Sequence, residues 1–197
     1  MIQYLVQSLK TDERLKIINK NQKILPKLKI FKSINGYDKN ETLLELKKSG
    51  LKYKDIKFKT YGSLANFLTK IKILKYQIEN NIQYLCFIED DLLIKKNFEH
   101  FINNHVYLLK TDINMLRLDN WGEGYVTSLS GAKDIIYKIY KYGILNNIDN
   151  QIRIWNKLRE IRLYNTPWIL VIKTNNGDCL KTEKFTNKEI LHYLKNS

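Results

Sequence analysis

The stretch YLCFIEDDLLI, residues 84–94, joins an apolar segment with the length of a strand to three consecutive acids. Residues 84–88 offer no polar face, which is typical of a strand buried on both sides of a parallel sheet. Glu89, Asp90 and Asp91 follow at the carboxyl end of that strand. In open α/β sheets, ligands bind beyond the carboxyl ends of the strands. The stretch therefore predicts an α/β fold with a ligand site at the acidic triplet.

Three adjacent carboxylates repel one another, and a bound cation with an anionic ligand would relieve that repulsion. Oxygen ligands suit Mg²⁺ or Mn²⁺ better than Zn²⁺. Such a metal would stabilise a departing diphosphate. Because alternate residues of an extended chain face the same way, Glu89 and Asp91 are expected to point together and Asp90 apart. The plainer interpretation, in which these acids only end a strand and cap the next helix, stays open.

Strand and helix patterns alternate on the amino-terminal side of this stretch. The helix directly before it keeps apolar residues at helical spacing, with lysines opposite. The turn Asn35-Gly36 closes an earlier strand. The expected elements are strands at 2–6 and 28–34, helices at 12–25, 41–48 (capped by Asn40, ended by Gly50) and 63–80, and a lysine-rich loop or edge segment at 52–59.

On the carboxyl-terminal side, the same patterns predict strands at 113–118, 124–129 and 168–172, and helices at 97–104, 130–142, 148–162 and 187–195. This alternation predicts one α/β domain over residues 1–197. Its central sheet is expected to be mainly parallel, with some mixed pairing, and flanked by helices.

The composition fits a folded domain, because 44% of the 197 residues are hydrophobic. Cys86 and Cys179 form no CxxC pattern, which favours a reducing setting. The opening MIQYLVQSLK lacks a basic segment and a small-residue cleavage site, and no stretch approaches the roughly 20 apolar residues that span a bilayer. We therefore expect a cytoplasmic protein without a signal peptide or membrane span.

The net charge of +14 admits several partners, including nucleic acid, an anionic membrane face or a polyanionic substrate. Nearly all of it comes from dispersed lysines, and the usage of Lys, Asn and Ile resembles that of an AT-rich genome. A basic nucleic-acid-binding protein, or a metal-dependent nuclease using the same triplet, is the alternative function. No PD-x-E-x-K motif supports it, so we give nucleic acid little weight and keep a peripheral membrane contact open. The oligomeric state stays unknown.

Seven segments carry a resemblance by their order and spacing: QSLKTDERLK (7–16), FKSINGYD (31–38), YGSLANFLTKIKILKYQI (61–78), YLCFIEDDLLI (84–94), GYVTSLSGAKDII (124–136), NNIDNQIRIW (146–155) and YNTPWILVI (164–172). Together they resemble glycosyltransferase family 25, the lipopolysaccharide-biosynthesis and procollagen-galactosyltransferase type. The resemblance implies a GT-A-like fold, with residues 1–95 as the nucleotide-binding half and 96–197 as the acceptor-binding half.

The resemblance further implies metal-dependent, inverting transfer of a sugar from a nucleotide-sugar, with a UDP-hexose as the expected donor. A glycan or related hydroxyl would be the acceptor. Asp91 would bind Mn²⁺ or Mg²⁺, with Glu89 as a second ligand, and Asp90 would contact the ribose or a metal-bound water. Arg14 would bind the diphosphate. The other expected donor-binding residues are Gln7, Ser8, Asn35 and Gly36.

An inverting reaction needs a carboxylate that deprotonates the acceptor hydroxyl. Asp149 is the first candidate, because it matches the family's Ile-Asp segment, and Asp119 and Glu123 in LDNWGEG (118–124) are the second choices. The chain departs from the family at Thr69-Lys70, where a Ser-His pair is usual, and at Gly177-Asp178, where a Ser is usual. A non-catalytic remnant that binds a glycan or a protein partner is a third possibility.

Overall fold

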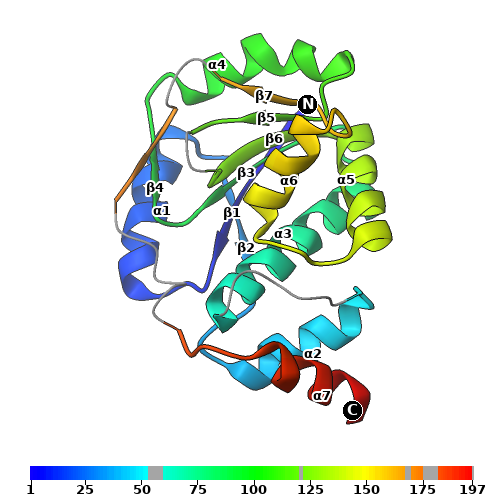
Figure 1. Cartoon of the computed structure of the whole chain (residues 1–197). Coiled ribbons are helices and arrows are strands. Elements are labelled where there is room, and N and C mark those ends of the chain that lie inside the picture. Colours follow the sequence, from blue (N-terminus) through cyan, green and yellow to red (C-terminus); the bar gives the residue numbers. More distant parts are fainter. Residues whose placement is uncertain (53–59, 120–121, 167–169, 175–181, 197) are drawn as a thin grey trace.

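The computed structural model describes residues 1–52, 60–119, 122–166, 170–174 and 182–196. In this part of the chain a six-stranded sheet has the order β2-β1-β3-β6-β5-β7, and β4 pairs with β8 beside it (Figure 1). The strands are β1 (Ile2–Ser8), β2 (Lys29–Lys32), β3 (Tyr84–Glu89), β4 (Leu92–Ile94), β5 (Met115–Arg117), β6 (Gly124–Ser128), β7 (Leu163–Asn165) and β8 (Val171–Lys173).

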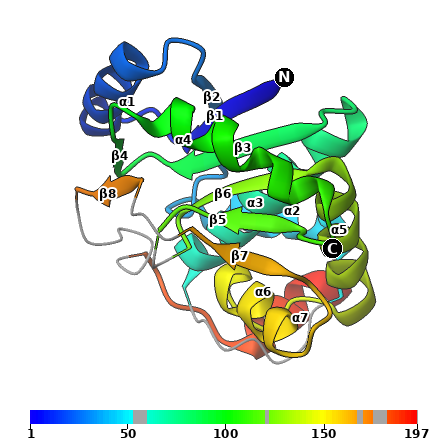
Figure 2. The same ribbon diagram turned by 90° about the horizontal axis from the view of Figure 1, so that it is seen from above.

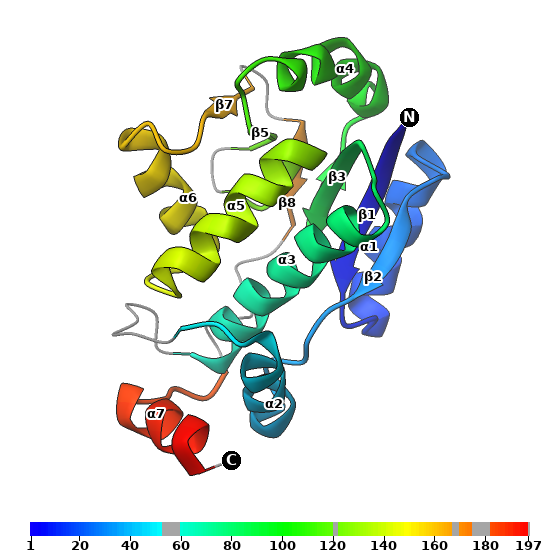
Figure 3. The ribbon, with the colours of Figure 1, turned by 90° about the vertical axis from the view of Figure 1, so that its right-hand side faces the viewer.

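Helices cover both faces of the six-stranded sheet (Figures 2 and 3). One face carries α3 (Tyr61–Glu79), α5 (Leu129–Tyr142) and α6 (Ile148–Lys157), with α2 (Lys39–Ser49) and α7 (Asn187–Asn196) at its end. The other face carries α1 (Asp12–Ile24), α4 (Phe98–His105) and the β4-β8 pair, and a short 3₁₀ helix, η1 (Val106–Lys110), follows α4. None of the described helices combines the length and the apolarity needed to cross a bilayer.

The pairing of β1, β2 and β3 brings their carboxyl ends to one edge of the sheet. β1 is parallel to both neighbours, and Gln7 pairs with Glu89 at the end of the register. β6 runs antiparallel to β3 and β5, whereas β5 and β7 are parallel. The predicted α/β class, with a mainly parallel but mixed sheet flanked by helices, is confirmed.

β3 is buried on both faces, as its lack of a polar face predicts. Leu85 and Phe87 pack into the core beneath α3 and α5, whereas Cys86 and Ile88 pack into the core beneath α1 and α4. Because strand side chains alternate, each face of this strand serves a different core. The acidic triplet is therefore fixed by packing from both sides.

Several predicted boundaries are wrong for local reasons. Asp38, not Asn40, caps α2, because its carboxylate accepts a hydrogen bond of 3.0 Å from the backbone N–H of Glu41. α6 ends at Lys157 rather than at Arg162, because Arg159 adopts a positive φ of 57° that stops the helix. Gly50 ends α2 in a left-handed conformation, as predicted.

The sequence patterns missed β4 and β7. Each has three residues, which is too short for a periodic signal, and each depends on a partner that is distant in the chain. α5 begins at Leu129, because the Ser128 hydroxyl accepts a hydrogen bond of 3.0 Å from the Gly131 N–H. The predicted lysine-rich segment at 52–59 lies largely outside the described residues, as does the start of the predicted strand at 168–172.

Asn21 joins α1 to the strand that leaves the acidic triplet. Its fully buried side chain donates a 2.7 Å hydrogen bond to the carbonyl of Leu92 and accepts one of 3.1 Å from the N–H of Ile94. A helix side chain thus completes the backbone pairing of β4. This contact fixes where the chain runs after Asp91.

Replacement of Asn21 by Ala should destabilise the protein. The change leaves the Leu92 carbonyl and the Ile94 N–H buried without a partner, at about 1–3 kcal/mol each. For a chain of this size, the melting temperature should fall by roughly 5 °C or more. Asn19→Ala, on the exposed face of the same helix, is the matched control in a thermal melt. Equal melting of the two variants would contradict this role of Asn21.

Candidate active site

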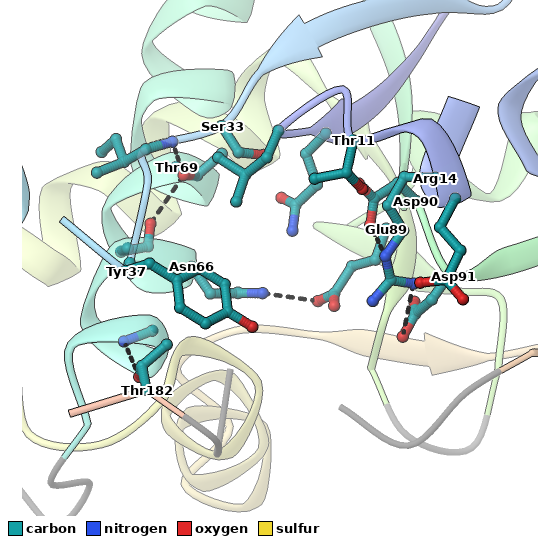
Figure 4. A pocket seen from close by; sticks show the side chains of 17 residues that line it. Thr11, Arg14, Ser33, Tyr37, Asn66, Thr69, Glu89, Asp90, Asp91 and Thr182 are labelled. Atoms are coloured by element: carbon teal, nitrogen blue, oxygen red, sulfur yellow. Dashed lines mark hydrogen bonds and ion pairs between the residues drawn. The ribbon is translucent and has the colours of Figure 1, made fainter. Parts of the chain in front are cut away.

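A pocket of about 420 Å³ opens at the carboxyl ends of β1 and β3 (Figure 4). The end of β1, the start of α1, the β2–α2 loop, the first turns of α3 and the acidic triplet form its walls. The lining side chains that carry polar or aromatic groups are Gln7, Thr11, Glu13, Arg14, Ser33, Tyr37, Asn66, Thr69, Glu89, Asp90, Asp91 and Thr182. The pocket thus lies where the sequence predicts a ligand site.

Glu89 has other partners than Asp90 and Asp91, which both lie beside Arg14 (Figure 4). Glu89 Oε1 accepts hydrogen bonds from Asn66 Nδ2 at 3.2 Å and pairs with Lys70 Nζ at 2.9 Å. Arg14 lies between the other two acids, with Nε 3.6 Å from Asp90 Oδ1 and Nη1 3.8 Å from Asp91 Oδ2. The prediction that Glu89 and Asp91 point together and Asp90 apart is wrong. β3 ends at Glu89, so strand alternation does not extend through the turn that follows.

The Asp91 carboxylate is buried and only partly compensated. Burial, followed by the nearby carboxylates of Glu89 and Glu123, raises the pKa of Asp91 to about 7. Its Oδ1 is buried without a hydrogen-bond partner among the described residues, and so is Gln7 Oε1 in the same pocket. The Asp91 carbonyl, in contrast, accepts hydrogen bonds from the N–H and hydroxyl of Thr174, which fix the turn.

The acids beside the pocket offer few free oxygen donors for a metal ion. No three His, Cys, Asp or Glu side chains are grouped as a metal site in the described part of the chain. Mg²⁺, however, usually binds proteins through one or two carboxylates and completes its coordination with substrate phosphates and water. The open Oδ1 of Asp91 fits a site of that kind. Glu89, the second predicted ligand, already shares Oε1 between Asn66 and Lys70.

The remaining predicted donor-binding residues divide into two groups. Gln7, Arg14 and Gly36 line the pocket, together with the triplet. Ser8 and Asn35 are not among the lining residues; the Ser8 hydroxyl accepts from the Lys10 N–H at 2.9 Å, and the Asn35 side chain accepts from the Tyr37 N–H at 3.0 Å. A side chain at Gly36 would lie 2.4 Å from the Cα of Gly62, so this glycine permits the loop to approach α3.

Among the three candidate bases, Asp119 accepts hydrogen bonds from backbone N–H groups of its own loop through both carboxylate oxygens. Its Oδ1 accepts from the N–H of Gly122, and its Oδ2 accepts from the N–H groups of Glu123 at 3.0 Å and Gly124 at 2.8 Å. Asn120 and Trp121 lie outside the described residues. The Asp119 carboxylate therefore serves the backbone of the loop between β5 and β6.

Glu123 keeps one carboxylate oxygen open. Its Oε1 pairs with the ammonium of Lys173, whereas its Oε2 is buried and has no hydrogen-bond partner among the described residues. Burial raises the pKa of the Glu123 carboxyl above its ordinary value. A carboxylate oxygen without a partner is a candidate proton acceptor, but Glu123 is not among the residues that line the pocket.

Both carboxylate oxygens of Asp149 are engaged. Oδ1 lies 3.0 Å from Lys70 Nζ and accepts a 2.8 Å hydrogen bond from the hydroxyl of Tyr125, and Oδ2 lies 3.3 Å from the same ammonium. Burial alone would lower the pKa of Lys70, but the carboxylates of Asp149 and Glu89 raise it above its ordinary value. Lys70 therefore stays charged in the interior.

Sequence reasoning missed several lining residues, notably Tyr37, Asn66 and Thr182. Gly62, Asn66 and Thr69 recur every three or four residues, so the helical period of α3 gave a signal for one wall of the pocket. Nothing local to the sequence marks Thr182. It reaches the pocket because its hydroxyl accepts a 2.7 Å hydrogen bond from the N–H of Gly62, 120 residues away.

A sheet whose parallel strands end at a pocket lined by acids and an arginine defines an α/β protein with a ligand-sized pocket at the strand ends. A family model described as glycosyltransferase family 25 (LPS biosynthesis protein) matches residues 1–151. The chain belongs to this family and is a glycosyltransferase. The predicted membership of glycosyltransferase family 25 is confirmed. The family implies a nucleotide-sugar donor and an acceptor.

Several solved structures are similar over nearly the whole chain. A glycosyltransferase involved in glycosylation of the major capsid of PBCV-1 is 9% identical, with 100% of this chain and 99% of that chain covered and a TM-score of 0.48. A mutant of LgtC is 8% identical (99% and 95% covered, TM-score 0.47). A cytidylyltransferase from Leptospira borgpetersenii serovar Hardjo-bovis (strain JB197) is 13% identical (98% and 93% covered, TM-score 0.49). No curated protein matches the chain.

Gly122 should tolerate substitution less well than Gly50. Both have positive φ, 90° and 64°, but a side chain at Gly122 would lie 2.5 Å from the Tyr125 hydroxyl, whereas none of the described atoms lies within 4 Å of one at Gly50. Gly50→Ala should cost about 1 kcal/mol from the left-handed backbone alone. Gly122→Ala should cost at least twice as much in chemical denaturation, because it also displaces Tyr125 from Asp149. Similar losses in the two variants would contradict this crowding.

Proposed function

We propose that the chain transfers a hexose from a UDP-sugar to a hydroxyl of a glycan, with inversion at the anomeric carbon and with Mn²⁺ or Mg²⁺ bound at Asp91. One observation carries the proposal: a family 25 chain has a pocket at the carboxyl ends of β1 and β3, where a buried, open Asp91 oxygen lies beside Arg14. A volume of about 420 Å³ is within the usual range of small-molecule sites.

The pocket offers complementary groups for the parts of such a donor. The guanidinium of Arg14 presents several N–H donors, which suits a diphosphate. The bound metal would supply Lewis-acid stabilisation to the departing diphosphate. Asp91 would hold that metal, and Gln7 would offer its unpartnered amide oxygen in the same pocket. The exposed ring of Tyr37 at the pocket wall is available to stack on a nucleobase.

For the acceptor, the contacts favour Glu123 as the general base. Its Oε2 is open, whereas Asp119 holds three backbone N–H groups and Asp149 is bound by Lys70 and Tyr125. In this role Glu123 accepts the proton of the acceptor hydroxyl, while Lys173 holds its other oxygen. Asp149, the first candidate from the sequence, then belongs to the support behind the pocket.

UDP and Mn²⁺ should stabilise the protein together more than the sum of their separate effects. At ligand concentrations of about 100 times the dissociation constant, a gain of about 2.7 kcal/mol is expected, or roughly 5–10 °C in melting temperature. Asp91→Asn should lose the Mn²⁺-dependent part of that shift. Asp134→Asn, on α5 and not among the pocket-lining residues, is the matched control. The proposal fails if wild-type protein shows no shift with UDP and Mn²⁺ yet binds duplex nucleic acid in a salt-sensitive way.

Glu123→Gln should lower kcat by about 10²–10⁴-fold with little change in the donor KM, because removal of a general base affects the chemical step. Asp149→Asn should lower kcat much less and should mainly lower the melting temperature. Initial rates of UDP release from a panel of UDP-hexoses with Mn²⁺ and a glycan acceptor measure both effects. If Asp149→Asn abolishes turnover in a stably folded protein while Glu123→Gln does not, the base is Asp149.

A further inference from the structure

Lys70 lies immediately behind the pocket, on α3, and its side chain is 1% exposed. Its ammonium contacts three different parts of the chain. Nζ lies 2.9 Å from Glu89 Oε1 at the end of β3, 3.0 Å from Asp149 Oδ1 in the first turn of α6, and 3.2 Å from the carbonyl of Gly122 in the β5–β6 loop. The ring of Tyr125 lies beneath it, at 5.7 Å from its centroid.

These contacts use the whole donor capacity of the side chain. A lysine ammonium has three N–H donors, and Glu89, both oxygens of Asp149 and the Gly122 carbonyl together supply four acceptors. Nothing remains to bind a phosphate or a sugar directly. Because a buried charge is tolerated only when it is paired, this cation and its two carboxylates form one unit. Any effect of Lys70 on substrate must therefore act through the groups that it holds.

Those groups belong to the candidate active site. Glu89 lines the pocket, and Asn66, one turn earlier on α3, donates to the same Glu89 oxygen that Lys70 contacts. Gly122 directly precedes Glu123, and the carbonyl of Glu123 accepts a 3.0 Å hydrogen bond from the Glu89 N–H. An ion pair that served stability alone would need only Asp149. The contact with Glu89 connects the cation to the donor pocket. The contact with Gly122 connects it to the loop of Glu123, the proposed base for the acceptor.

We propose that Lys70 is a positioning residue for sugar transfer, a built-in cation that fixes the Glu89 carboxylate at the pocket wall and holds the loop of Glu123 against α6. This inference rests on the proposed function. Asp149 is the counter-ion that makes the buried cation tolerable, and Glu89 is the group through which the cation acts on the donor. Loss of the cation should therefore disturb both folding and turnover, and the two effects should be separable.

The test compares Lys70→Met, Asp149→Asn and the double variant in the full chain, with UDP-hexose, Mn²⁺ and acceptor. Lys70→Met should lower the melting temperature, because two partly buried carboxylates lose their partner, and should lower kcat about 10²-fold, as small misplacements of active-site groups do. The double variant should recover most of the melting temperature, because the Asp149 charge is also gone. Its kcat should stay at least 10-fold low, because Glu89 still lacks its ammonium partner and keeps only the Asn66 hydrogen bond.

Lys72→Met is the matched control. Lys72 is on the same helix, its side chain is exposed, and Glu45 is its ion-pair partner among the contacts described. Recovery of kcat together with melting temperature in the double variant would reduce Lys70 to a structural ion pair and overturn the inference, with the proposed function intact. A wild-type protein that neither binds UDP with Mn²⁺ nor transfers sugar would overturn both. Recovery of melting temperature without recovery of kcat supports the positioning role.

Discussion

Electrostatic repulsion among carboxylates at one edge of the sheet is the constraint on which this structure depends. The acids come from the end of β3, the β5–β6 loop and α6, so no single segment can separate them. Buried charges are tolerated only when opposite charges compensate them. Three cations do so, each in a different direction: Arg14 toward Asp90 and Asp91, Lys70 toward Glu89 and Asp149, and Lys173 toward Glu123.

The compensation leaves two carboxylate oxygens open, on Asp91 and on Glu123, among the described residues. A ligand that supplied partners to those two atoms would stabilise the protein, because a buried oxygen without a partner is costly. Packing keeps them in place. β3 is buried on both faces. The Asn21 side chain hydrogen-bonds the strand that follows the triplet, and the Thr174 hydroxyl donates to the Asp91 carbonyl. A rigid scaffold thus holds a locally undercompensated site, as binding and catalysis require.

Much of this could be predicted from the sequence. The apolar run of β3 and the acids after it predicted the fold class and the position of the pocket. The order and spacing of seven segments predicted the family. The environment of each acid could not be predicted, because it depends on side chains from distant elements. Lys70 stood out only as a departure from a family pattern, and nothing in its neighbours indicated a buried contact with Asp149, 79 residues away. The side-chain directions expected for Glu89, Asp90 and Asp91 assumed an extended strand, whereas the chain turns at Asp90.

The claim that Asp91 holds a metal beside the donor diphosphate can be tested most directly by anomalous diffraction from crystals grown with UDP and Mn²⁺. The account predicts a manganese peak bonded to the Asp91 carboxylate, with the diphosphate between the metal and Arg14 and the nucleotide in the pocket that Tyr37 and Asn66 line. Nucleotide bound elsewhere on the molecule, or manganese that makes no bond to Asp91, would contradict it.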